Sequence, residues 1–217
     1  MHVSEILQII EIKKVFFETV PYCLTHGIME YLKSLGHKAP KSAVSDYLEW
    51  FEDAYFLFTV GIFDASLARR KTNPKKIYCI DHAMITSLAS GILVNSGHLL
   101  ENLVFTALRR VSPEVYYYKT KGGLEVDFIV SLPASSPAAQ AGIRNPSRLL
   151  VQFCESMDEP QTRKREVTAL SEAMTELDLK ASTIVTRSEE EEIKVDAKKI
   201  EVVTVWRFLL NLAEPQL

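Results

Sequence analysis

The sequence has few cysteines and lacks the short motifs of several large enzyme classes. Its three cysteines, Cys23, Cys79 and Cys154, are far apart and form no CxxC pair. This spacing favours reduced core thiols over a disulfide framework or a zinc site. There is no GxxxxGK[ST] stretch, so this chain has no Walker-type ATP site. It also has no HExxH and no GxSxG stretch, which excludes those zinc-peptidase and serine-hydrolase patterns.

Long apolar runs and a strong net charge are also missing. No uninterrupted apolar span reaches the ~20 residues of a transmembrane helix. The N-terminus carries Glu5 and Glu11 within its apolar pattern and lacks the layout of a signal peptide. We therefore expect a cytoplasmic protein with no membrane partner. The net charge is -3 at pH 7, so any binding to nucleic acid depends on a local basic patch.

The N-terminal part of the chain predicts a winged helix over residues 1–81. Apolar residues at helical spacing predict helices over 3–20 and 28–35, and Pro40 and Ser42 open a third helix. Two β-rich runs follow, at 55–60 and 76–80. Three helices followed by a β-ribbon with a basic loop are typical of a winged helix-turn-helix.

This winged helix has two interpretations. In the first it binds DNA, with the third helix in the major groove and the basic loop on phosphates; the candidate residues are Lys41, Ser45, Arg69, Arg70, Lys71, Lys75 and Lys76. In the second it is a packing module, because Asp46 and Glu49 on the outward face of that helix repel a phosphate backbone. Both interpretations stay open.

Residues 82–217 predict a second domain with a mixed β-sheet. A short helical piece lies in the connector 81–96, and a helix is expected over 98–110. A β-hairpin turns at Gly122 and Gly123. The second strand of this hairpin alternates, with Leu124, Val126, Phe128 and Val130 on one face and Glu125 and Asp127 on the other.

The strand at 149–154 is apolar on both faces, as in a central strand, and Gln152 and Cys154 share one face. The remaining segments are a loop (131–147), a helix capped by Thr162, a strand (182–186), an acidic solvated loop (188–192), a strand (201–205) and a helix (206–212). An antiparallel hairpin followed by a helical crossover predicts an α/β (α+β) fold with helices on the faces of a mixed sheet.

Three cations, Arg163, Lys164 and Arg165, follow Thr162 in the predicted first turn. Cations in that position oppose the helix dipole. Three explanations stay open: a phosphate held nearby, an acidic partner held nearby, or simple solvation.

A carboxylate on one strand that faces a polar pair on the next is the layout of a magnesium-dependent nuclease. Mg²⁺ prefers hard oxygen ligands, and a lysine stabilises the charge that develops on the phosphate. Asp127, Gln152 and Cys154 occupy such positions here. Glu101 lies inside the apolar stripe of the helix 98–110, where it is either a partly solvated acid or a carboxylate that faces these strands.

Five stretches, "NPKKIYCID", "GHLLENLVF", "YYYKTKGGLEVDFIV", "LLVQFCES" and "TRKREVTAL", resemble the C-terminal half of prokaryotic, largely archaeal, AAA+-type ATPases. In those proteins an ATPase domain precedes a winged helix and a PD-(D/E)xK restriction-endonuclease-like domain of unknown function. The resemblance implies nuclease positions at Glu101, Asp127, Gln152 and Cys154. It also implies DNA or an AAA+ ATPase as partners and Mg²⁺ as a cofactor.

Two of these positions depart from the family pattern. Gln152 stands where an acidic ligand is usual, and its uncharged carbonyl holds Mg²⁺ more weakly. Cys154 stands where a lysine is usual, and a thiol cannot replace an ammonium. Glu125 or Glu155 is a candidate to compensate for the lost charge, and Glu125 is preferred because it shares a face with Asp127. The candidate metal ligands are Asp127, Glu125 and Glu101. Lys119 or Arg165 could supply a migrated cation.

Three functions follow from this pattern. The first is a nucleic-acid-associated module with a degenerate, inactive metal site. The second is an active Mg²⁺-dependent DNA endonuclease. The third is a protein-interaction module that docks to an AAA+ ATPase.

Overall fold

The computed structural model describes residues 33–34, 36, 40–88, 96–132 and 148–213. The helix predicted over 3–20, most of the helix over 28–35, nearly all of the loop 131–147 and Cys23 lie outside these residues. The chain divides into two compact units. The first contains Met1–Gly61 and Lys71–Thr106, and the second contains Ile62–Arg70 and Ala107–Leu217.

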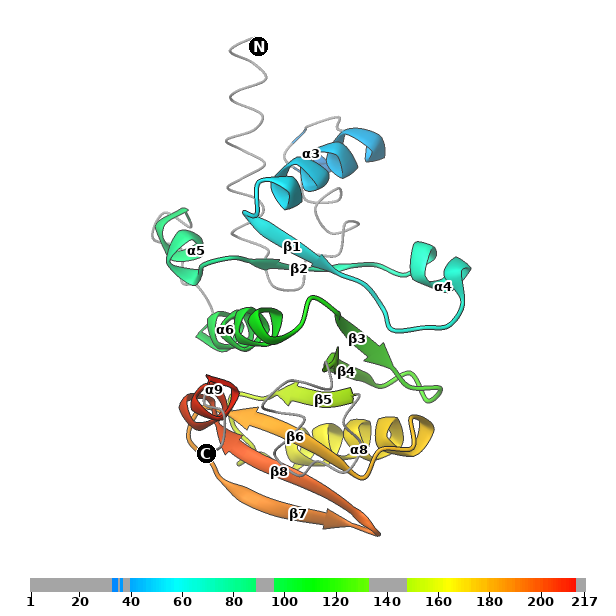
Figure 1. Cartoon of the computed structure of the whole chain (residues 1–217), viewed down its shortest axis with the longest axis vertical. Coiled ribbons are helices and arrows are strands. Elements are labelled where there is room, and N and C mark those ends of the chain that lie inside the picture. The colour runs from blue at the N-terminus through cyan, green and yellow to red at the C-terminus, as the bar shows by residue number, and fades with distance from the viewer. Residues whose placement is uncertain (1–32, 35, 37–39, 89–95, 133–147, 214–217) are drawn as a thin grey trace. The chain divides into compact units, whose positions relative to one another are not determined.

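The first unit contains a helix and a two-stranded antiparallel ribbon (Figure 1). Helix α3 (Lys41–Asp53) buries Val44 and Leu48, one helical turn apart. Strand β1 (Leu57–Val60) pairs with β2 (Lys76–Cys79). The predicted basic loop between these strands contains the short helix α4 (Leu67–Thr72), and α5 (His82–Leu88) follows β2 as predicted.

The second unit is a six-stranded mixed sheet in the order β3-β4-β5-β6-β8-β7 (Figure 1). This sheet with its flanking helices confirms the predicted α+β fold class. The helix α6 (Ser96–Val111) precedes the hairpin of β3 (Val115–Lys119) and β4 (Glu125–Ser131), which is antiparallel to β5 (Arg148–Phe153). The remaining elements are α8 (Pro160–Glu176), β6 (Ala181–Thr186), β7 (Glu191–Val195), β8 (Lys198–Thr204) and α9 (Val205–Ala213).

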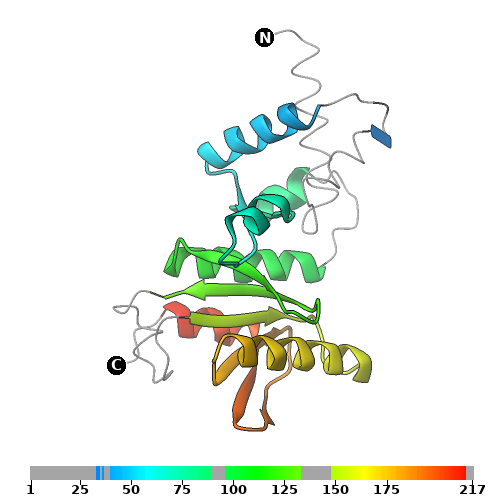
Figure 2. The same cartoon turned by 90° about the vertical axis from the view of Figure 1, so that its right-hand side faces the viewer.

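Helix α8 is the crossover between the parallel strands β5 and β6, and it packs along the sheet (Figure 2). A parallel pair needs such a crossover, because the chain must return to the same end of the sheet. Leu170, Ala173 and Met174 of α8 are buried against β-strand residues that include Leu150 and Ile184. No helix in the described part of the chain is both long and apolar enough to cross a membrane.

A β-bulge interrupts the alternation that the sequence predicted for β4. Tyr116 pairs with Ile129 and Tyr118 pairs with Val126, so Asp127 and Phe128 together lie opposite one residue of β3. As a result, Val126 and Ile129 share the core beneath α8. The prediction that Val126 and Phe128 lie on one continuous face is wrong, because the extra residue shifts the side chains that follow it to the other face.

Two further local predictions are wrong. Helix α8 begins at Pro160, a favoured first residue of a helix, and its N-cap residue is Glu159. The Thr162 hydroxyl donates to Glu159 Oε2 at 2.7 Å instead of capping the helix. The acidic run 188–192 is a loop only over residues 188–190, because β7 begins at Glu191.

The turn of the β3–β4 hairpin is held against α8 by two glutamates. The Tyr118 hydroxyl donates to Glu176 Oε2 at 2.6 Å, and the backbone N–H of Lys121 donates to Glu176 Oε1 at 2.9 Å. Burial, together with the hydrogen bond to Glu176, raises the pKa of Tyr118 to about 12. The Thr120 hydroxyl donates to Glu172 Oε2 at 3.0 Å, so the hairpin has a defined position on the helix.

Replacing Gly123 by alanine is expected to destabilise the second unit. Gly123 has φ = +86°, a backbone conformation that costs an L-residue about 1 kcal/mol or more. Urea unfolding of Gly123→Ala should show a loss of about that size. Gly61→Ala is the control, because an added methyl group there meets nothing within 4 Å. Equal stabilities of the two variants would contradict the assigned turn.

Candidate functional site

Asp127 and Gln152 lie side by side at the end of the β4–β5 pairing. The backbone N–H of Asp127 donates to Gln152 Oε1, and the backbone N–H of Phe153 donates to Asp127 Oδ2, both at 3.0 Å. Each side chain therefore satisfies a backbone N–H on the other strand. The bulge places Asp127 where it can do so, because the regular β4–β5 pairing begins at Phe128. The structure thus brings these two predicted residues together.

Glu166 of α8 completes this cluster and was not predicted from the sequence. It is 4% exposed. Burial raises the pKa of Glu166, and the negative charge of Asp127 acts in the same direction, whereas Arg165 and the Gln152 side chain lower it. Glu166 directly follows the strongly basic segment 163–165, so the sequence pattern did not single it out as a site residue. A signal was available, because Glu166 is spaced three and four residues from the helix positions Ala169 and Leu170 that are buried.

Arg165 is the cation of this cluster. Its Nε and Nη2 atoms donate to Glu166 Oε1 at 2.9 and 2.5 Å. The Arg165 side chain is 66% exposed, whereas that of Glu166 is 6% exposed. The pair therefore joins a buried carboxylate to a guanidinium at the surface.

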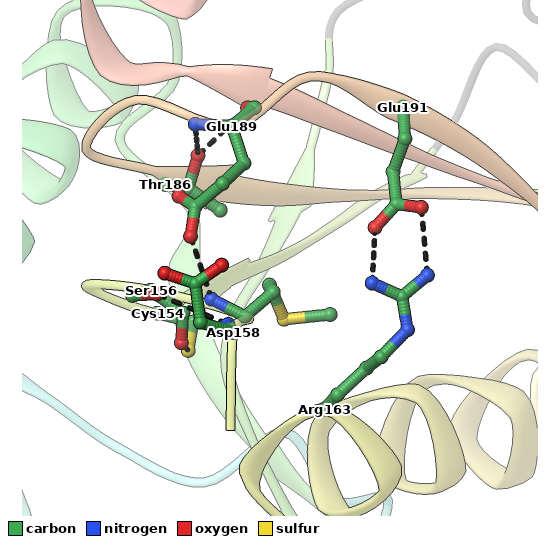
Figure 3. Close-up of polar contacts among 8 residues, drawn as sticks. Cys154, Ser156, Asp158, Arg163, Thr186, Glu189 and Glu191 are labelled. Atoms are coloured by element: carbon green, nitrogen blue, oxygen red, sulfur yellow. Dashed lines mark hydrogen bonds and ion pairs between the residues drawn. The ribbon is translucent and has the colours of Figure 1, made fainter. Parts of the chain in front are cut away.

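Cys154 is a buried, neutral thiol. Its Sγ donates to the Ser156 backbone carbonyl at 2.9 Å (Figure 3). Burial, and next the nearby charge of Glu166, raise the pKa of Cys154 to about 11. The side chain at this position therefore supplies no positive charge near neutral pH, as the substitution of cysteine for lysine led us to expect.

Arg163 belongs to a separate ion pair. Its Nη1 and Nη2 atoms donate to the two carboxylate oxygens of Glu191 on β7, at 2.5 and 2.6 Å (Figure 3). Of the three explanations for the cationic segment, an acidic partner therefore applies to Arg163. Because α8 begins at Pro160, these cations lie beyond its first three residues, where the helix dipole opposes them less.

Glu101 lies in the first unit, in a network of its own. The Tyr78 hydroxyl donates to Glu101 Oε1 at 2.8 Å, and Lys76 Nζ is 4.0 Å from the same oxygen. The Tyr78 ring stacks on Phe105, with centroids 4.3 Å apart. Glu101 is 4% exposed, so it is not the partly solvated acid of the first interpretation.

The predicted nucleic-acid contacts fall into three groups. Lys76 is 3% exposed, so its ammonium is not available to a phosphate. Arg69 pairs with Asp64 at 2.9 Å, and Lys75 donates to Thr59 Oγ1 at 3.3 Å. The remaining described candidates, Ser45, Arg70 and Lys71, are exposed. The side chain of Lys41 lies outside the described part of the chain.

The residues at the Asp127 cluster do not fit a magnesium ion. Mg²⁺ requires several oxygen ligands, yet Gln152 is uncharged, Cys154 offers a protonated sulfur, and Glu166 is held by Arg165. Glu125 lies at the exposed start of β4, opposite Lys119. Among the described residues, no group of three or more His, Cys, Asp or Glu side chains could hold a metal ion. These residues therefore support no reaction step through a metal ion.

Comparisons with known proteins give a family model and a relative without an established activity. A model described as a domain of unknown function (DUF4143) matches residues 96–138, which include α6 and the β3–β4 hairpin. The uncharacterized protein MJ1544 of Methanocaldococcus jannaschii is 32% identical over 193 residues, which are 85% of this chain and 40% of that protein. The chain thus spans less than half the length of this relative. No solved structure matches the chain.

Replacing Arg165 by glutamine is expected to destabilise the fold more near neutral pH than in mild acid. Loss of the guanidinium leaves the buried Glu166 carboxylate without its cation, at a cost of about 1–3 kcal/mol. It also raises the already raised folded-state pKa of Glu166 further. Protonation of Glu166 then stabilises the fold at low pH, and this contribution is lost as the pH rises through the folded-state pKa.

Urea unfolding at about pH 7 and about pH 5 measures this difference. Arg187→Gln is the matched control, because Arg187 pairs with Glu155 at 2.6 Å while both side chains are about half exposed. Its loss should stay below about 0.5 kcal/mol. A loss in Arg165→Gln that is equal at both pH values would show that Glu166 is not the group involved.

Proposed function

We propose that this protein is a nucleic-acid-associated module of an ATPase family, with a nuclease-like domain that binds without cutting. The observation that carries this proposal is the position of Gln152. Its carbonyl accepts the Asp127 backbone N–H, and its side chain also stabilises the charged form of Glu166. An amide thus stands beside Asp127 and Glu166, at the position where the PD-(D/E)xK pattern that the sequence resembles has an acid.

The chemistry of phosphodiester hydrolysis supports a binding role. Catalysis requires a preorganised positive charge at the phosphate as its negative charge develops. At position 154 a neutral thiol replaces the lysine of the family pattern, and the thiol hydrogen is directed to Ser156. Arg165 is a cation, but its Nε and Nη2 atoms donate to Glu166. These features favour retention of the fold without its reaction.

Helix α4 supplies a second surface for nucleic acid in this proposal. Exposed Arg70 and Lys71 lie in α4, which follows the first strand of the ribbon and precedes the second. The exposed residues of α3 include Asp46 and Glu49, which repel phosphates. In this proposal the basic residues of α4, rather than the third helix of the winged helix, contact the phosphate backbone of the nucleic acid.

Docking to a separate ATPase is the alternative function. The exposed acids Asp46 and Glu49 of α3 favour it, because they repel phosphates. In that arrangement the chain would bind the ATPase, and nucleic acid would not be required. The two proposals differ in whether the isolated chain binds DNA.

Binding and cleavage of labelled DNA by the purified chain tests the proposed function. We expect affinity that falls steeply as salt rises, since released counterions drive binding to phosphates. We expect no cleavage with Mg²⁺ or Mn²⁺. Cleavage that needs a divalent ion and is lost in Asp127→Ala would establish the active nuclease instead. Absence of salt-sensitive binding would favour the ATPase-docking module.

Restoring the family residues should create a metal site. The double variant Gln152→Glu with Cys154→Lys would place a third carboxylate beside Asp127 and Glu166, and divalent affinity rises with the number of charged oxygen ligands. Calorimetric titration of Mn²⁺ should detect binding in the double variant and not in the wild type. Adding Asp127→Ala to the double variant should abolish it. Mn²⁺ affinity unchanged from the wild type would show that positions 152 and 154 are assigned wrongly.

A further inference from the structure

Asp127 and Glu166 form a pair of carboxylates that needs a positive charge. The charge of Asp127 raises the pKa of Glu166, so the two groups lie within range of electrostatic repulsion. Glu166 is 4% exposed, and solvent screens it poorly. In a metal-dependent site a divalent cation would neutralise such a pair. Here the Arg165 guanidinium contacts Glu166 with two nitrogens.

The Arg165 guanidinium carries one positive charge, whereas a divalent metal ion carries two. The uncharged amide of Gln152 suits this smaller positive charge. A glutamate at position 152 would add a third negative charge next to the other two. Glutamine removes that charge while keeping a carbonyl oxygen for the Asp127 backbone N–H. With neutral Cys154, Arg165 is the cation that contacts the buried carboxylate of this cluster.

We propose that Arg165 takes the place of the metal ion and, with Lys164, forms a metal-independent binding site for the phosphodiester backbone of a nucleic acid. This inference rests on the proposed function and specifies where and how the nuclease-like domain would hold its ligand. It assigns the ligand-binding role to the exposed side of α8. The carboxylates below it serve only to position the guanidinium.

The surface around Arg165 fits a phosphate ligand. The Arg165 side chain is two-thirds exposed while one edge of its guanidinium is held by Glu166, so its orientation is set before a ligand binds. A planar guanidinium with several donors matches phosphate oxygens. Lys164 is exposed beside it and forms no ion pair with any described residue. Gln161 and Thr168, one helical turn away on either side, add uncharged polar groups.

The proposed site needs no metal ion. A metal ion in a nuclease binds both the carboxylates and the phosphate. Arg165 contacts the Glu166 carboxylate while two-thirds of its side chain is exposed, although it cannot activate a water molecule for attack. Such a site holds a phosphodiester and leaves it intact.

Fluorescence anisotropy with labelled single-stranded DNA, duplex DNA and RNA tests this site, with each titration done in EDTA and in magnesium chloride over a range of salt. The wild type should bind at least one of these ligands equally well in both buffers. Arg165→Gln and Lys164→Gln should each weaken that binding about tenfold and lower the slope of log affinity against log salt by about one. Arg165→Lys should retain part of the affinity.

Lys180→Gln is the matched control, because Lys180 is an exposed lysine beyond the other end of α8. Lys164→Gln breaks no described ion pair, so its effect is readable even if Arg165→Gln unfolds. Affinities of the Arg165 and Lys164 variants equal to that of the control would overturn the site. Binding that disappears in EDTA would overturn its independence of metal. If the wild type binds no ligand in either buffer, the proposed function fails together with this inference.

Discussion

The polar junction between β4 and β5 is the constraint on which the second unit depends. Two strands separate at Asp127 and Gln152, and each side chain accepts the backbone N–H that the other strand leaves open. Buried N–H groups without acceptors destabilise a fold, so both side chains are needed where they are. The same two residues reach the underside of α8 through Glu166. The junction therefore links the antiparallel hairpin to the helix that begins the parallel part of the sheet.

This double use ties the candidate site to the stability of the fold. Asp127 is required by the backbone of Phe153, whatever else it binds. The Gln152 carbonyl accepts the Asp127 backbone N–H, and Arg165 balances the buried Glu166. Each of these side chains serves a hydrogen bond or a charge balance of the fold, and together they do not form a set of oxygen ligands for a metal ion. In the function that we propose, this is why the arrangement is kept without a reaction.

The predictions from sequence were accurate where local patterns decide the structure. The turn at Gly122 and Gly123, the central strand near 149–154 and the amphipathic helix around 98–110 agree with β3–β4, β5 and α6. They failed where one residue changes the register. The bulge at Asp127 and Phe128 does not alter the composition of β4, so alternation alone could not reveal it. The N-cap of α8 was placed three residues late, at Thr162 instead of Glu159, because threonine and proline both favour helix starts.

The amino-acid sequence by itself determined the order of most helices and strands, without α4 and β7, the α+β class and the pairing of Asp127 with Gln152 on neighbouring strands. These features depend on periodicity, turns and neighbours along the chain. Only the tertiary structure decided which charges meet: Glu101 with Tyr78 and Lys76, Glu191 with Arg163, and Glu166 with Arg165. Some of these pairs join residues from separate elements, and others involve a side chain that is buried only because separate elements pack together. The partners therefore depend on tertiary packing, which no local sequence pattern predicts.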